Sequence, residues 1–318
     1  MILVIGEALI DLIGKADSGG KYQAVVGGAN ANVALALARR GEPQKFLGRI
    51  SSDGFGQIIR HRLESNGVDL SLSIAAKEQT SLAVATIGSG GSASYSFYLN
   101  GTADWAWSNN ELPTSSEVSA LGAKCVQYGC LTMAVEPGSE VVSAWLAGLN
   151  GLTKSHDLNI RSALGFERAR ELKRVLAINE YSDIIKASDA DLWWLFDRAD
   201  GSDIDDVAQA WSEGGRLVVI TRGGDGASLY HMGQRIDVPA PKVNLVDTVG
   251  AGDTFMANLL GELLDRDALG SNPRQRLAEL AETELISAAR FAAVAAGLVC
   301  ERQGCEPPTK SEVQALLG

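Results

Sequence analysis

One short stretch of the chain has the residue types of a phosphate site next to a carboxylate: Asp247-Thr248-Val249-Gly250-Ala251-Gly252-Asp253-Thr254-Phe255. An apolar helical pattern follows it, so the stretch reads as a loop that opens a helix. Its glycines let the backbone turn tightly, and the successive N–H groups from Gly250 to Asp253 can then converge on one point. Such amides, at the positive end of a helix dipole, bind phosphate or a developing phosphoryl charge.

Asp253 is the unusual residue of this stretch. A carboxylate repels a resting phosphate, but a kinase needs one there to accept the proton of the attacking hydroxyl group. The alternative is that Asp253 only caps the helix, as aspartate often does in a first turn. This stretch alone does not decide between the two.

A second glycine-hinged helix start lies near the N-terminus, where Gly27-Gly28-Ala29-Asn30-Ala31-Asn32 leads into an Ala/Leu-rich pattern that ends at Gly41. Gly28 allows a ligand to approach the backbone, and the Asn32 amide can donate to and accept from a polyol. We interpret Asn30 as a plain N-cap.

Two further sets of polar residues stand at expected strand ends. Asp11 lies between aliphatic residues, which favours an edge strand with the carboxylate in solvent over a pocket that binds hydroxyl groups. Asp157, Asn159 and Arg161 alternate, so on a strand they would share one side at the carboxyl edge of a sheet, where α/β proteins bind ligands. An exposed strand end is the alternative for this second set.

The glycine-rich turn Arg222–Ala227 follows the buried strand Arg216–Thr221. It has neither the sequence pattern of a P-loop nor a helix after it, which excludes a phosphate-binding loop of that type. The remaining interpretation is a β-turn that approaches a nucleotide from the side. Ser188 with Asp191 three residues on predicts a capping box in which Asp replaces Glu.

The elements that must position these residues alternate between strand and helix: Ile2–Ile5, the helix after Gly28, Phe46–Ile50, and a helix over Phe55–Asn66. This order predicts one α/β domain over residues 1–318 with a central, mostly parallel sheet. A hairpin over Thr80–Tyr98, with a turn at Gly88–Ser92, interrupts it. With the strands around residues 9–26, the segment 80–99 would form a small β-sheet lid over a cleft. A long Ala-rich helix is predicted over Arg276–Cys300.

Composition restricts the partners. Lys and Arg total 28 against 39 Asp and Glu, and the net charge of -11 argues against nucleic acid or an anionic membrane surface. We expect no signal peptide and no transmembrane span. The four cysteines lack the spacing of zinc sites and are interpreted as reduced thiols, which favours the cytoplasm.

Four stretches together resemble the ribokinase-like (PfkB) carbohydrate kinases, in the same order and spacing over essentially the whole chain. They are Gly27–Ala34, Asp157–Arg161, Ile220–Gly226 and Asp247–Asp253. The last is highly specific, and it moves the interpretation of Asp253 from capping to catalysis. Within the family, the GEALID-type opening and FLGRISSDGFG look most like the fructokinases.

The resemblance implies a three-layer α/β/α fold that binds a sugar under the lid and ATP, with Mg²⁺, across the carboxyl edge of the sheet. It implies that Asp253 is the base and that Gly250, Ala251 and Gly252 belong to the anion hole. The remaining expected sites are Asp11, Gly28, Asn32, Phe97 and Arg161 for the sugar, Ser188, Thr221, Gly223 and Gly226 for the nucleotide, and Asp247 and Val249 for a monovalent cation such as K⁺.

Fructose is the expected substrate, with 2-keto-3-deoxygluconate kinase or ribokinase-type activity as alternatives. Where many relatives carry an arginine after the lid aromatics, this chain has Phe97-Tyr98-Leu99, which favours a neutral sugar. Asp191 in place of the family glutamate puts a water-mediated role in magnesium binding in doubt. A sugar-binding protein without catalysis and a dinucleotide-dependent enzyme are the rival classes, although Gly6 stands alone where the latter needs GxGxxG. The lid could also pair two copies of the chain.

Overall fold

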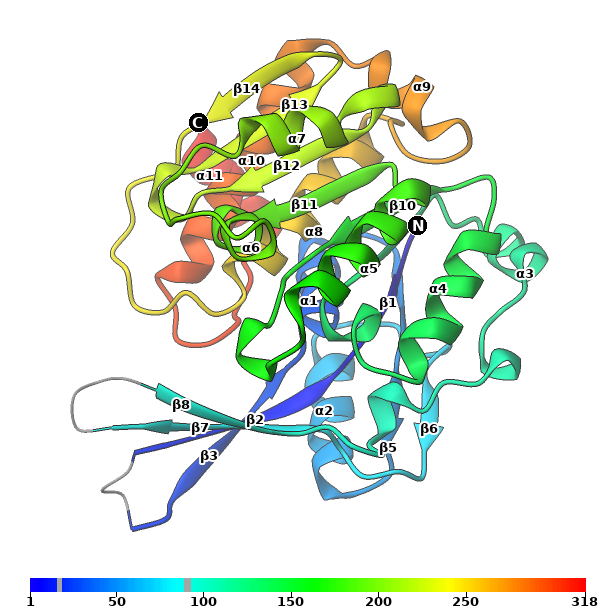
Figure 1. Ribbon diagram of the computed structural model, residues 1–318, viewed down its shortest axis with the longest axis vertical. Helices are drawn as coiled ribbons and strands as arrows, with labels where there is room; N and C mark the ends of the chain where they lie inside the picture. Colours follow the sequence, from blue (N-terminus) through cyan, green and yellow to red (C-terminus); the bar gives the residue numbers. More distant parts are fainter. Residues whose placement is uncertain (16–18, 89–92) are drawn as a thin grey trace.

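The computed structural model describes residues 1–15, 19–88 and 93–318. In this part of the chain, eight strands form a central sheet with helices on both faces (Figure 1). In spatial order the strands are β14 Gln234–Val238, β13 Ala227–His231, β12 Leu217–Thr221, β11 Ile184–Ser188, β10 Thr153–Asp157, β9 Cys125–Gly129, β1 Ile2–Ile5 and β4 Gln44–Leu47. The pairs from β4 to β12 are parallel, whereas β13 and β14 are antiparallel. The predicted fold class is confirmed.

Apolar side chains follow one another along the buried strands, and successive side chains point to opposite faces of a sheet. Both faces are therefore apolar, and a layer of helices covers each. Leu217 and Val219 of β12 pack in the cluster that contains Leu259 of α8 and Ala292 of α10. Val218 of β12 points the other way, into the cluster formed with α6 and α7. Figure 1 shows α4 to α7 on one face and α8 and α10 on the other.

The helices follow the predicted strand–helix order. They are α1 Ala29–Arg40, α2 Gly54–Ser65, α3 Ser115–Ala120, α4 Gly138–Gly148, α5 Arg168–Tyr181, α6 Asp189–Leu195, α7 Asp205–Trp211, α8 Ala251–Asp265, α9 Pro273–Ala278, α10 Glu282–Cys300 and α11 Lys310–Leu317. The capping box of α6 is present: Ser188 Oγ accepts from Asp191 N, and Asp191 accepts from Ser188 N.

A second sheet projects from the body of the molecule, and we call it the lid (Figure 1). Its strand order is β3 Tyr22–Gly27, β2 Leu9–Lys15, β7 Leu82–Ile87 and β8 Ala93–Tyr98. β2 pairs with β3 antiparallel and with β7 parallel. The predicted turn at Gly88–Ser92 lies outside the described residues, except for Gly88.

Two predicted elements are divided in the structure. The expected strand Phe46–Ile50 is split at Gly48, and the second half, β5 Arg49–Ser51, pairs with β6 Ile74–Ala76 in a separate sheet. A Cβ at Gly48 would lie 2.3 Å from the Phe46 ring, so the close turn needs glycine. The expected helix Arg276–Cys300 is two helices, α9 and α10, because Ala281 has extended backbone (φ -65°, ψ 147°) and starts a new helix.

By length and composition alone, α10 could cross a membrane, which differs from the expectation that no stretch could. Half of its apolar window is buried in the fold. Its residues Leu285, Ala288 and Ala292 belong to the cluster that α8 and β12 share. A core helix of this kind passes the same test of hydropathy.

Candidate active site

A cavity of about 1520 Å³ runs between the lid, the carboxyl ends of the parallel strands and the N-terminus of α8. Segments that are far apart in the sequence meet there. Every residue that the family resemblance assigned to the site lines it: Asp11, Gly28, Asn32, Phe97, Arg161, Ser188, Thr221, Gly223, Gly226, Asp247, Val249, Gly250, Ala251, Gly252 and Asp253.

The N-terminus of α8 has the geometry of an anion site. Gly250 is the N-cap in the left-handed region (φ +77°), and a Cβ there would lie 2.3 Å from Cys305 Sγ. The first helical bond runs from Thr254 N to Gly250 O at 2.8 Å, so the amides of Gly252 and Asp253 have no partner within the helix. These amides and the helix dipole favour negative charge at this point.

One of the four amides expected to converge is already used. Ala251 N donates to Thr248 O at 3.2 Å, inside the loop that precedes the helix. The anion site therefore relies on fewer backbone donors than the sequence predicted. A buried ammonium group stands beside it, because a Cβ on Gly252 would lie 3.3 Å from Lys186 Nζ.

Two side-chain amides hold the carboxylate of Asp253. Asn32 Nδ2 donates to Asp253 Oδ2 at 2.8 Å, and Asn159 Nδ2 donates to Oδ1 at 3.4 Å. Burial raises the pKa of Asp253 to about 6; the Asn32 hydrogen bond acts in the opposite direction, and the nearby Asp157 carboxylate adds to the increase. The group is therefore oriented, and it can hold or release a proton near neutral pH.

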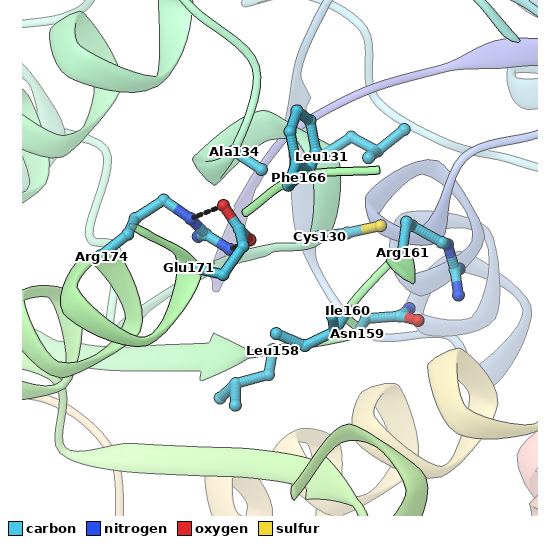
Figure 2. A pocket seen from close by; sticks show the side chains of 10 residues that line it. All are labelled: Cys130, Leu131, Ala134, Leu158, Asn159, Ile160, Arg161, Phe166, Glu171 and Arg174. Carbon is cyan, nitrogen blue, oxygen red and sulfur yellow. Dashed lines mark hydrogen bonds and ion pairs between the residues drawn. The ribbon is translucent and has the colours of Figure 1, made fainter. Parts of the chain in front are cut away.

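The loop after β10 differs from the predicted alternating strand end. The strand stops at Asp157, and Asn159 has a left-handed backbone (φ +42°), so Asn159 and Arg161 lie on a loop. Figure 2 shows this loop, with the sulfur of Cys130 on the side of Arg161. Cys130 and Asp253 raise the pKa of Arg161 above its ordinary value.

Asp157 does not line the cavity with its two partners in the motif. It forms a buried ion pair with Lys186, whose Nζ lies 2.7 Å from Asp157 Oδ2. Sequence reasoning missed Lys186, although a lysine inside the apolar strand Ile184–Ser188 was a visible signal. The pair keeps an ammonium group at the cavity wall next to the anion site.

Asp11 lies on β2, which is an inner strand of the lid, so the favoured edge-strand interpretation is wrong. Its side chain faces the cavity. Burial raises its pKa to about 6, and Arg161 acts in the opposite direction. Phe97 of β8 lines the same side of the cavity and stacks on Tyr95 with ring centroids 6.1 Å apart.

The start of α1 also differs from the prediction. Gly28, not Asn30, is the N-cap; its φ is +108°, and a Cβ there would lie 2.5 Å from Glu7 O. Asn30 is the second residue of the helix, where its Nδ2 donates to Glu7 Oε2 at 3.0 Å and to Gly129 O at 3.1 Å. Glu7, which the sequence did not single out, thus anchors the first turn of α1, which presents Asn32.

The nucleotide-side residues lie at the ends of β11 and β12. Gly226 has φ +100°, and a Cβ there would meet Val238 O at 2.1 Å, so this turn requires glycine. Thr221 Oγ1 donates to Ala187 O at 3.4 Å. Asp191 accepts from Ser188 N and from Ile160 N, both at 2.8 Å, and so joins α6 to the loop after β10.

Asp247 has both carboxylate oxygens bonded to backbone amides. Oδ1 accepts from Val249 N at 3.1 Å and Oδ2 from Gly304 N at 2.9 Å. Within residues 1–15, 19–88 and 93–318, no group of three or more His, Cys, Asp or Glu residues is placed to hold a metal ion. Any cation would therefore be held mainly by backbone carbonyls, water and phosphate oxygens.

Residues 1–312 match the profile of the pfkB family carbohydrate kinases. A fructokinase from Rhizobium leguminosarum bv. trifolii is 34% identical over 295 aligned positions, and the alignment covers 87% of each chain. A fructokinase from Xylella fastidiosa with bound ATP has a TM-score of 0.86 at 27% identity, covering 99% of this chain and 97% of that one.

A more distant structure shares the fold. A fructokinase from Vibrio cholerae O395, solved with fructose, ADP and calcium ion, has a TM-score of 0.80 at 24% identity. The match covers 100% of this chain and 98% of that one. The whole architecture, lid included, thus recurs in solved kinases.

Proposed function

We propose that this chain, which belongs to the pfkB family of carbohydrate kinases and is an ATP-dependent enzyme, phosphorylates the terminal hydroxyl group of fructose. The full-length similarity to fructokinases supports this choice of sugar. The observation that carries the proposal is the position of Asp253, whose carboxylate is held in the cavity between the lid and the anion site.

In the proposed reaction, the sugar hydroxyl lies against Asp253, which accepts its proton as the oxygen attacks the γ-phosphorus of ATP. The bond between that phosphorus and the β–γ bridging oxygen breaks, and ADP leaves. The amides of Gly252 and Asp253, together with the dipole of α8, stabilise the negative charge on the transferred group. Lys186, beside Gly252, adds positive charge at the same place.

The chemistry of the lid supports a neutral sugar. Among the described lid residues that line the cavity, Asp11 is the charged one, and the others include Leu9, Ala83 and Phe97. A carboxylate accepts hydrogen bonds from hydroxyl groups but repels a phosphate or a sugar acid. Fructose presents hydroxyl groups and no charge.

The position of Arg161 favours the second candidate substrate, 2-keto-3-deoxygluconate. Its guanidinium group lines the same cavity, and a sugar acid offers a carboxylate that arginine binds well. In the fructose proposal, Arg161 instead faces the carboxylates of Asp11 and Asp253 and the reacting phosphoryl group.

We also propose that Mg²⁺ accompanies ATP and that K⁺ binds at Asp247 and Val249. The site fits hard cations, because the carboxylates of Asp191 and Asp247 lie at the cavity wall and can add to backbone carbonyl, water and phosphate oxygens. When bound, magnesium neutralises charge on the phosphates of ATP. Both carboxylates are fixed by backbone amides, which keeps their oxygens in place.

The test is ADP release in the presence of ATP and Mg²⁺ against fructose, ribose, nucleosides and 2-keto-3-deoxygluconate, with Asp253→Asn as the matched control. We expect fructose to give the highest kcat/KM and phosphorus NMR to show a phosphate ester on the terminal carbon. Preference for the sugar acid would replace the first candidate by the second. Sugar binding with no more ADP release than Asp253→Asn would instead support a sugar-binding protein without catalysis. Binding of NAD would support a dinucleotide-dependent enzyme.

We further propose a homodimer that pairs through the lid and a cytoplasmic location. The lid carries exposed aromatic side chains, with Tyr22 at 43%, Tyr95 at 56% and Tyr98 at 60% exposure. The four cysteines are free thiols, which suit a reducing compartment. Light scattering of the wild type and Tyr98→Asp tests the dimer; equal masses for the two would argue against this interface.

A further inference from the structure

The lid is attached to the body where the chain passes from one to the other. These crossings are Ala8 before β2, Gly28 after β3, Ser81 before β7 and Leu99 after β8. A few residues beyond the last crossing lies Asp104, in the short helical turn Ala103–Trp105. Its side chain is 2% exposed, and it has no role in the phosphoryl transfer described above.

The carboxyl group of Asp104 joins three of the four crossings. Its Oδ1 accepts from Ala8 N at 2.8 Å, and its Oδ2 lies 2.5 Å from Ser81 Oγ. Ser81 Oγ in turn lies 2.6 Å from Thr102 Oγ1, which donates to Leu99 O at 2.8 Å. The starts of β2 and β7 and the end of β8 therefore meet at one buried side chain.

The number of hydroxyl hydrogens in this row of contacts favours a neutral carboxyl group on Asp104. Thr102 has one hydroxyl hydrogen, which it gives to Leu99 O, so it can only accept from Ser81. Ser81 then has no hydrogen left for Asp104, and the contact between them needs the hydrogen of a protonated carboxyl. If Asp104 is ionised, Ser81 must donate to it, and Thr102 can no longer serve both Ser81 and Leu99.

The charges around Asp104 agree with this count. Burial raises its pKa to about 7; the contact with Ser81 and the hydrogen bond from Ala8 N act in the opposite direction, and the neighbouring Glu7 carboxylate adds to the increase. Arg49, which donates to Ala103 O at 2.9 Å, pairs with Glu78 and Glu111 rather than with Asp104.

We propose that Asp104 is a positioning residue for the sugar site: in its neutral form it joins the crossings of the lid and so holds the lid over the bound sugar. The connection to the site is short. Asp11 is three residues beyond Ala8, and Phe97 is two residues before Leu99; both line the cavity. A lid that shifts at these crossings moves both side chains relative to Asp253.

Kinetics of Asp104→Ala and Asp104→Asn test the proposal, with ATP and the preferred sugar of the panel. Asp104→Ala should raise the KM for the sugar about tenfold, the effect of losing buried hydrogen bonds, and leave the KM for ATP unchanged. Asp104→Asn should stay within about twofold of the wild type at pH 7, because an amide accepts from Ala8 N and donates to Ser81 Oγ as the neutral acid does.

The pH profile separates positioning from a general loss of structure. In the wild type the sugar KM should rise above about pH 7, where Asp104 ionises, and in Asp104→Asn this rise should be absent. Asp183→Asn is the matched control: it is a buried aspartate that accepts from Lys154 N at 3.0 Å, before the start of β11 and away from the lid. It should leave the sugar KM unchanged.

Hydrogen–deuterium exchange of β2 and β7 gives a readout without any sugar, so the proposal is tested even if fructose is not the substrate. Exchange should be faster in Asp104→Ala than in the wild type. If that variant does not fold, Ser81→Ala should still raise the sugar KM about threefold, because it removes one link. Unchanged sugar KM and exchange, or an Asp104→Asn variant as impaired as Asp104→Ala, would overturn the proposal.

Discussion

The two walls of the cavity are built in opposite ways. The anion-site wall comes from one contiguous stretch, Asp247–Phe255, whose backbone amides and helix dipole face the ligand. The lid wall comes from four strands spread over residues 9 to 98, and it faces the ligand with side chains. The first wall is part of the large, two-sided core, whereas the second is attached by a few crossings.

This difference separates the chemistry from the choice of sugar. Backbone amides at a helix start are positioned by the helix itself, so they suit a step that every member of a kinase family shares. Side chains on a separate sheet can be replaced one at a time without disturbing that step. Changes to the anion wall should therefore reduce kcat, and changes to the lid wall should raise the KM for the sugar.

Among the variants that leave the base in place, the largest effect is expected at the backbone wall. Gly250→Ala places a methyl group 2.3 Å from Cys305 Sγ and forces alanine into a left-handed conformation at φ +77°. We expect kcat to fall about a hundredfold, as when an oxyanion-hole donor is lost. Gly54→Ala is the control at another helix start: Gly54 is the first residue of α2, does not line the cavity, and a Cβ there meets nothing within 4 Å. Equal rates for the two variants would contradict the role given to this helix start.

The pH profile compares the two walls directly, since Asp253 and Asp11 both have pKa values raised to about 6 by burial. If both must be ionised, log kcat/KM for the sugar should fall below about pH 6 with a slope of two, and in Asp11→Asn with a slope of one. Both groups bind a proton more tightly in the folded protein, so their contribution to the free energy of unfolding should decrease as pH rises from 3.8 to about 6. Thermal denaturation of the wild type and of Asp11→Asn across that range isolates the Asp11 contribution: the stability of the wild type relative to the variant should fall as pH rises.

A smaller effect is expected from the lid alone. Asp11→Asn removes a charged acceptor for sugar hydroxyl groups, which should raise the sugar KM about tenfold and change kcat much less. Steady-state kinetics with varied sugar and varied ATP separate the two. A loss confined to kcat would mean that the lid takes part in the chemical step, and the comparison of the walls would fail.

The smallest effect concerns the support of the base. Asn159→Gly removes the amide that donates to Asp253 Oδ1 at 3.4 Å, and glycine accepts the positive φ of this position without strain. A bond this long contributes little, so we expect kcat to fall about threefold. Asn32→Ala removes the 2.8 Å bond and should reduce kcat more than Asn159→Gly does. An equal fall in kcat for the two variants would show that the length of the hydrogen bond does not determine the contribution of each donor.

Local sequence was enough to predict the parts that depend on neighbouring residues. The tight turn and the helix start around Gly250 follow from glycine spacing, and the strand–helix order predicts the parallel sheet. The capping box of Ser188 and Asp191 is equally local. In each case the side chains and the backbone that they shape lie within a few residues of one another.

What the sequence did not reveal depends on distant partners. Asn30 looks like a cap, but Glu7, 23 residues earlier, binds it inside the helix. Asp11 looks like an edge residue, because its neighbours β3 and β7 cannot be assigned from the strand itself. Lys186 acquires its meaning only through Asp157 on the adjacent strand.

The role of Asp253 as the base is tested by phosphoryl transfer in Asp253→Asn, measured alongside ATP binding by calorimetry. We expect ATP affinity to stay unchanged while the rate of ADP release with sugar falls at least about a hundredfold, since removal of a general base costs this much or more. A variant that binds ATP and keeps more than about a hundredth of the wild-type rate would contradict the assignment of Asp253 as the base.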